Sequence, residues 1–211
     1  MIESTIEMNN QIFNGKTFNE KYLDQILVKL TNQLENHNGY QFQTGLNIDS
    51  ITFKPKGECQ PGGIYFCQLK HLPLWVNYSN KQMFYVRFVT IPDDALVWIE
   101  RDKFKADRLI LVERLEIGDL EVWKDPAYCL TAVKNNNYAF KYVKEQTEEI
   151  NLAAVKKDGR VLKYVLEQTE KINLAAVKTN GYALEYVLEQ TPQICLAAVK
   201  NSGCALQYVR E

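Results

Sequence analysis

The C-terminal part of the chain repeats itself every 22 residues. Written in rows of 22, residues 125–211 align without a gap as rows 125–146, 147–168, 169–190 and 191–211. Row 169–190 reads TEKINLAAVKTNGYALEYVLEQ, and columns of leucine, valine, lysine and tyrosine run through all four rows. Self-similarity at a fixed period is the sequence signature of a repeat protein. This part is therefore expected to fold as a stack of similar units.

Each row carries the signals that start and stop a helix. The first position suits an N-cap, because its side-chain oxygen can accept from free backbone N–H groups. These positions are Asp125, Thr147, Thr169 and Thr191. Proline follows at 126 and 192, where a helix needs no N–H. Later in each row comes a residue that tolerates the left-handed conformation of a helix end. These residues are Asn137, Gly159, Gly181 and Gly203. Each row thus predicts a helix, a tight turn and a second helix.

One such unit cannot bury its apolar face alone, so the rows predict an all-α solenoid of four helix-turn-helix repeats. The leucine and valine columns would fill the seam between repeats, and paired alanines would let helices approach closely. The tyrosine column is expected to form a core ladder with its hydroxyls at the rim, or alternatively an exposed aromatic binding face. Its members are Tyr142, Tyr164, Tyr186 and Tyr208.

The lysine column is the candidate partner-binding feature, because packing does not demand a cation. It consists of Lys134, Lys156, Lys178 and Lys200. One interpretation is a solvated face that gains from the helix dipole; the other is a basic stripe that binds an acidic protein partner. Glutamates at 145, 167 and 189 lie nearby, and the chain has 25 Lys and Arg against 26 Asp and Glu. Nucleic acid is therefore an improbable partner. The last repeat is not strongly polar, so it could also join a second copy.

The front of the chain predicts an α+β domain with a mainly antiparallel sheet. We expect a flexible N-terminus over residues 1–16, the α+β domain over 17–122 and the repeat domain over 123–211. Thr17 and Glu20 have the spacing of a capping box, which predicts a helix over 18–26. Residues 27–31 continue the helical pattern but could instead form a strand. Other expected elements are extended segments at 51–53, 64–67, 83–91, 95–99 and 108–117, a loop at 54–63 and a helical segment at 68–79.

Two parts of the chain resemble sequences of large DNA viruses. The LAAVK-x-x-G-x-AL-x-YV rows over residues 125–211 resemble a short helical repeat domain of unknown function. Three segments resemble a front domain of uncharacterised mimivirus-type repeat proteins: NHNGYQFQTGLNID at 36–49, PGGIYF at 61–66 and FKADRLILVER at 104–114. In such proteins this domain often precedes ankyrin repeats, which we do not recognise in this sequence. The resemblance implies a viral origin and a host-facing role, but no catalytic residue.

No specific catalytic motif stands out. The chain contains no P-loop, GxSxG or dinucleotide-binding fingerprint, and its two histidines have no metal-ligand spacing, so no metal is expected. Five cysteines without a CxxC pair argue against a disulfide framework. Neither a signal peptide nor a membrane span is expected. These features favour a soluble protein of a reducing compartment, here the host cytoplasm, with packaging in the virion as an alternative.

A fainter resemblance concerns ADP-ribosyltransferases of the poly-ADP-ribose polymerase type. The pieces that carry it are His37, the Gly45-Leu46 pair, the GIYF run at 63–66 and Glu113. It implies NAD as cofactor, with His37 on the ribose, Tyr65 stacked on nicotinamide and Glu113 catalytic, or Glu116 in its place. The glycine that should follow His37 comes one residue late, and the segment from Tyr65 to Glu113 is short.

Three functions therefore remain open. The leading hypothesis is a non-enzymatic protein-protein interaction module or scaffold, viral and host-directed, that uses the solenoid surface. The second is an NAD-using transferase in which the solenoid recruits the target. The third is a structural component of the virion.

Overall fold

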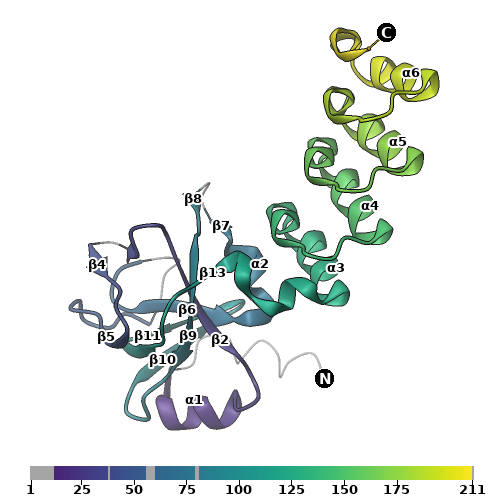
Figure 1. Ribbon diagram of the computed structural model, residues 1–211. Coiled ribbons are helices and arrows are strands. Elements are labelled where there is room, and N and C mark those ends of the chain that lie inside the picture. The colour runs from purple at the N-terminus through teal and green to yellow at the C-terminus, as the bar shows by residue number, and fades with distance from the viewer. Residues whose placement is uncertain (1–11, 38, 56–59, 79–80, 211) are drawn as a thin grey trace, which may run out of the picture. The chain divides into compact units, whose positions relative to one another are not determined.

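The computed structural model describes residues 12–37, 39–55, 60–78 and 81–210. The chain divides into two compact units, Met1–Asp119 and Leu120–Glu211. This division falls three residues before the boundary expected between residues 122 and 123. Each unit is described by itself (Figure 1).

The first unit is built on an antiparallel sheet. Among its described residues the strands follow one another in the order β1 (Ile12–Asn14), β10 (Leu96–Glu100), β11 (Lys103–Ala106), β6 (Ile64–Gln68), β2 (Leu27–Thr31), β9 (Tyr85–Thr90), β12 (Arg108–Leu111) and β5 (Gly45–Ile48). β13 (Leu115–Glu116) also pairs with β9. Two small hairpins lie outside this sheet: β3 (Asn36–His37) with β4 (Tyr40–Gln41), and β7 (Asn77–Tyr78) with β8 (Lys81–Gln82). The α+β class with an antiparallel sheet agrees with the expectation from the sequence.

The sheet opens between its two central strands. β2 and β6 pair Leu27 with Gln68 and Val28 with Cys67. From Val28 to Thr31, β2 pairs with β9, while Ile64–Phe66 of β6 pair with β11. The β2–β6 ladder therefore covers one end of both strands, and the rest of the two strands diverges. This opening matters because a cavity lies at it.

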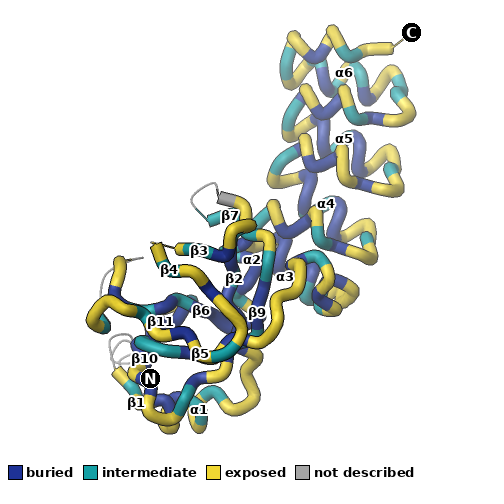
Figure 2. The backbone as a smooth tube through the Cα atoms, turned by 60° about the vertical axis from the view of Figure 1, so that its left-hand side comes forward, coloured by how far each residue is buried: buried dark blue, intermediate teal, exposed yellow. Residues whose placement is uncertain are grey.

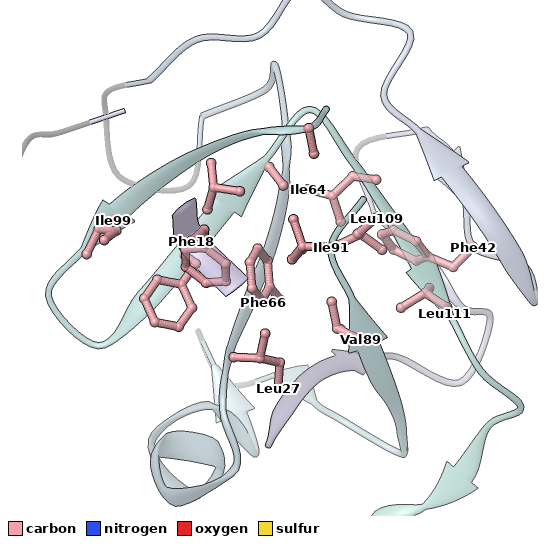
Figure 3. Packing of buried hydrophobic residues seen from close by; sticks show 14 residues of the cluster. Phe18, Leu27, Phe42, Ile64, Phe66, Val89, Ile91, Ile99, Leu109 and Leu111 are labelled. Carbon is pink, nitrogen blue, oxygen red and sulfur yellow. The ribbon is translucent and has the colours of Figure 1, made fainter. Parts of the chain in front are cut away.

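The hydrophobic core covers one face of the sheet and is rich in aromatic rings. Figure 3 shows Phe18, Phe66, Ile91 and Leu109 gathered in it. The rings of Phe18 and Phe104 meet edge to face with centroids 5.1 Å apart. Tilted and edge-to-face pairs of this kind gain about 0.5–1.5 kcal/mol beyond the area they bury.

The helix at the start of the domain is shorter and earlier than expected. α1 spans Gly15–Lys21, because the side chain of Asn14 caps it by accepting from the Thr17 backbone N–H at 2.9 Å. The prediction of a helix over 18–26 was therefore wrong at both ends. Residues 27–31 form the strand that the sequence left open as an alternative. Residues 12–16 belong to β1 and α1, which corrects the expectation of a flexible segment there; residues 1–11 lie outside the described residues.

The remaining expectations for the first unit are met in part. The segments at 64–67, 83–91 and 95–99 correspond to β6, β9 and β10, but 108–117 is divided between β12 and β13. The helical segment ends early, as η3 (Leu69–His71) and α2 (Leu72–Trp75), because β7 follows at once. Residues 51–53 are not a strand; the strand of that region is β5, which ends at Ile48 and pairs with β12. In the loop at 54–63, residues 56–59 lie outside the described residues.

The second unit is helical and regular. Its described residues form four α-helices of ten residues: α3 (Pro126–Asn135), α4 (Glu148–Lys157), α5 (Glu170–Thr179) and α6 (Pro192–Asn201). A 3₁₀ helix of six residues follows each one: η6 (Asn137–Tyr142), η7 (Gly159–Tyr164), η8 (Gly181–Tyr186) and η9 (Gly203–Tyr208). Successive α-helices pack against each other (Figure 1). Each buries similar positions in turn, which Figure 2 shows as recurring dark segments.

The N-caps lie where the sequence places them. Asp125 accepts from the N–H groups of Ala127 and Tyr128. The threonines of the next three rows accept from the N–H group three residues on. Trp123, in the short η5 (Glu121–Lys124), is fully buried and stacks on Tyr142 with centroids 5.2 Å apart.

The glycines have a different role from the one expected. Asp158 and Asn180 end their helices in extended conformation, and Gly159 and Gly181 then open the 3₁₀ helices without a positive φ. The left-handed helix end was therefore a wrong prediction. A Cβ on Gly159 would lie 2.3 Å from the carbonyl oxygen of Ala176 in the following helix. Glycine is needed at position 159 because the backbone there lies close to the backbone of the following helix, α5.

Candidate functional site

The lysine column forms an exposed row on the second unit. Lys134, Lys156, Lys178 and Lys200 are all exposed, each in the last turn of its α-helix. A cation at that end complements the partial negative charge of the helix C-terminus. Two of the four lysines, Lys156 and Lys178, also border a shallow hollow.

A shallow hollow lies along α4 and α5. Lys156 and Lys178 line it, together with Glu170, Lys171, Leu174, Ala175 and Thr179. Leu174 and Ala175 supply half-buried apolar surface, and Lys171 forms an ion pair with Glu148 on α4. The hollow therefore combines half-buried apolar surface with three ammonium groups and the carboxylate of Glu170, and one of the ammonium groups, that of Lys171, is already paired.

The tyrosine column is less buried than a core ladder requires. Tyr164 is 47% exposed, and the tyrosines at 142, 186 and 208 are half-buried. Burial raises the pKa of Tyr142 to about 12, since the phenolate is disfavoured beside Trp123. The side chains that fill the interior of the 3₁₀ segments are Phe140, Leu162 and Leu184.

A cavity of about 320 Å³ lies in the first unit, at the opening between β2 and β6. His37 and Tyr65, the two residues to which the transferase resemblance gives NAD-binding roles, both line it, and the residue that follows His37 lies outside the described residues. Glu113 lies on the exposed segment between β12 and β13 and is not among the described lining residues. Glu116, in β13, is also exposed and outside the lining. The structure thus brings two of the three residues together without a carboxylate.

Other features of the cavity had no signal in the sequence that we recognised. Lys29 and Lys103 line it from β2 and β11, and both are buried. Cys67 lies on the wall, and burial raises the pKa of its thiol to about 12. Lys29 could have been found from the strand pattern, since it stands inside the apolar run of β2, where a buried charge is costly. Lys103 had no such signal, because it opens β11, which also contains Lys105.

The described residues contain no group of three His, Cys, Asp or Glu side chains placed to hold a metal ion. Within the same residues, no helix has the length and apolar character to cross a membrane. The described cysteines, Cys67, Cys129, Cys195 and Cys204, are free thiols; Cys59 lies outside the described residues.

Comparison with known proteins finds one matching family model and several relatives. The family model described as Domain of unknown function (DUF4116) matches three overlapping stretches, residues 125–169, 147–191 and 169–211. Uncharacterized protein R869 of Acanthamoeba polyphaga mimivirus is 33% identical over 107 residues, which cover 50% of this chain and 78% of R869. The chain belongs to the same family as R869, a family of uncharacterised proteins with mimivirus members.

Two further mimivirus relatives carry the name putative ankyrin repeat protein. R868 is 28% identical over 133 residues, covering 58% of this chain and 64% of R868. R229 is 35% identical over 103 residues, covering 44% of this chain and 32% of R229. The chain thus spans less than two thirds of either of these relatives. No solved structure matches the chain.

Proposed function

We propose that the chain is a non-enzymatic protein-interaction module whose second unit is a solenoid of four 22-residue repeats. The observation that carries this proposal is the exposed lysine row beside the hollow along α4 and α5. Stacked repeats present a continuous surface to a partner. The names of R868 and R229 as putative ankyrin repeat proteins support a repeat module that binds proteins.

The partner on this face is an acidic segment of a protein. Four ammonium groups at a regular spacing complement a row of carboxylates, and such complementarity steers association and fixes register. We further propose that this role is host-directed, in the host cytoplasm or from the virion. Because the face is exposed, salt should weaken binding.

Charge reversal tests the proposal. The probe is a fluorescent polyglutamate peptide titrated with the whole chain. We expect Lys156→Glu with Lys178→Glu to weaken binding by about tenfold or more, since each lost contact is worth up to about 1 kcal/mol. The control is Lys144→Glu with Lys163→Glu, which changes charge equally on exposed residues of the same unit outside the hollow. If both double variants weakened peptide binding equally, the effect would come from net charge alone. The proposal that the lysine row binds the partner would then be refuted.

Self-association through the last repeat is a second candidate. Leu206 is 65% exposed, although Leu162 and Leu184 at the matching positions of earlier repeats are fully buried. An exposed leucine at a position built for packing favours contact with another copy. Light scattering over a concentration series tests it. A mass that rises with concentration, and falls back in Leu206→Glu, is expected; a constant monomer mass would exclude it.

A further inference from the structure

The cavity at the opening of the sheet combines positive charge with aromatic walls. Among the described residues that line it, the ionisable cations are Lys29, Lys103 and His37, and none is Asp or Glu. The same lining includes the rings of Phe42, Tyr65, Phe66, Trp75 and Tyr78. Its volume of about 320 Å³ lies within the range of small-molecule sites.

The two lysines approach the cavity from different strands. Lys103 is 9% exposed and pairs with Glu100, its Nζ 3.5 Å from Glu100 Oε2. The same Nζ lies 4.8 Å from the ring centroid of Tyr65 and 5.1 Å from that of Trp75. Lys29 is 7% exposed, with Nζ 4.7 Å from the ring centroid of Phe42. An aromatic face attracts an ammonium group through the electrostatics of the ring. Rings of the cavity wall thus contact both cations, and Glu100 also pairs with Lys103.

One wall is polar and fixed by its own hydrogen bonds. The Asn32 amide donates to the Asn36 carbonyl at 2.9 Å, and its oxygen accepts from the Asn36 N–H at 3.1 Å. Both asparagines line the cavity beside Thr31. A preorganised polar edge costs little entropy on binding and can select the orientation of a ligand.

We propose that this cavity binds a small molecule in which a planar ring system carries an anionic group, phosphate or carboxylate. The ring packs against the wall formed by Trp75 and Tyr78, whose own rings contact each other with centroids 5.5 Å apart, and the anion is held by Lys29 and Lys103. Ring stacking supplies apolar burial, while charge-assisted hydrogen bonds to the ammonium groups supply the larger share of selectivity. This site goes beyond the proposed function and does not depend on it, because it lies in the other unit.

Calorimetry with the full chain tests the site, using AMP, UMP and indole-3-carboxylate as probes. At least one is expected to bind with a dissociation constant below about 1 mM. The half ligands, namely adenosine, uridine or indole with inorganic phosphate or acetate, should bind at least about tenfold more weakly than the matching probe. Failure of all three probes to bind would overturn the proposal. So would a neutral half ligand that binds as tightly as its anion.

Variants locate the binding. Lys103→Met and Lys29→Met should each weaken binding of the best probe by about tenfold, while Lys70→Met, an exposed lysine of the same unit, should leave it unchanged. Should either methionine variant fail to fold by circular dichroism, photo-crosslinking of 8-azido-AMP to the unaltered chain decides instead. Crosslinks found in peptides that cover residues 28–42 or 64–78, or in the peptide that contains Lys103, would support the site. Labels confined to other peptides contradict it.

Discussion

The side-chain amide of Gln168 binds the backbone of the next repeat at two points. Its Nε2 donates to the carbonyl of Tyr186 at 2.9 Å, and its Oε1 accepts from the N–H of Leu188 at 3.0 Å. Gln146 makes the same pair of bonds one row earlier, and Gln190 one row later. These three glutamines therefore tie each row to the next in a fixed register.

Removing one of these amides should loosen the stack. Gln168→Met keeps the length of the side chain but loses both bonds, so we expect unfolding free energy to fall by about 1–2 kcal/mol. Urea unfolding followed by circular dichroism measures it. Glu167→Ala, on the exposed neighbour, serves as the control. A loss no larger than that of the control would show that the amides do not hold the repeats together.

The glycines offer a test of close approach with an internal control. Gly159→Ala should destabilise by about 1–3 kcal/mol, because the new methyl would collide with the Ala176 carbonyl. A Cβ on Gly203 meets nothing within 4 Å, so Gly203→Ala should be neutral or stabilising by up to about 1 kcal/mol. Comparison of the two melting temperatures checks the prediction, and similar losses in both variants would contradict it.

Glu35 is a buried carboxylate that should govern the acid stability of the first unit. Arg87 donates to both of its oxygens, at 2.8 and 3.0 Å, and Arg114 adds a bond at 3.1 Å. The pKa of Glu35 is lowered, mainly because Arg87 donates to the charged form. The stabilisation is complete above the pKa of an unfolded glutamate, about 4.3. It is lost as pH falls through the lower pKa of the folded state.

Glu35→Gln should therefore cost about 3–5 kcal/mol at neutral pH, since it leaves Arg87 buried beside a neutral amide. The cost should shrink on acidification. Urea unfolding at a series of pH values provides the measurement. Asp94→Asn, which breaks an ion pair with a 74% exposed carboxylate, should cost less than about 1 kcal/mol. A Glu35→Gln variant as stable as Asp94→Asn would disprove the central role of this pair.

The thiols should react in the order of their exposure. Burial raises the pKa of Cys67 to about 12 and that of Cys129 to about 11, so both remain protonated at neutral pH. Cys204 is exposed. Among the four described cysteines, iodoacetamide should therefore label Cys204 first and Cys67 only after unfolding, because the thiolate is the nucleophile. Mass spectrometry of tryptic peptides reads the order. Early labelling of Cys67 in the folded chain would show that its strand opens.

The α-helix starts of the second unit could be predicted closely because their signals are local. N-caps such as Thr169 and the first-position proline at 192 depend on nearby backbone groups, and both appear as expected. The role of Gly159 was missed because its constraint comes from Ala176 in the next row rather than from its own φ. The Gln168 bonds were missed for the same reason: they join residues 18 and 20 positions apart.

The first unit was harder because its strands are short and pair over long distances. β1 pairs with β10, more than 80 residues later in the chain, and no local pattern in residues 12–14 predicts this pairing. Lys29 and Lys103 lie far apart in the sequence, and only the folded chain brings both of them to the cavity wall. His37 and Tyr65 were singled out through a family resemblance, and they do line one cavity, but Glu113 stands on a different segment.

An NMR titration tests most directly whether the lysine row binds an acidic partner. The isotope-labelled whole chain is titrated with the polyglutamate peptide while backbone amide shifts are followed. The largest shifts should cluster at Lys134, Lys156, Lys178 and Lys200 and around Leu174, and salt should reduce them. Shifts that gather within residues 12–119, or that spread evenly over all exposed lysines, would contradict it.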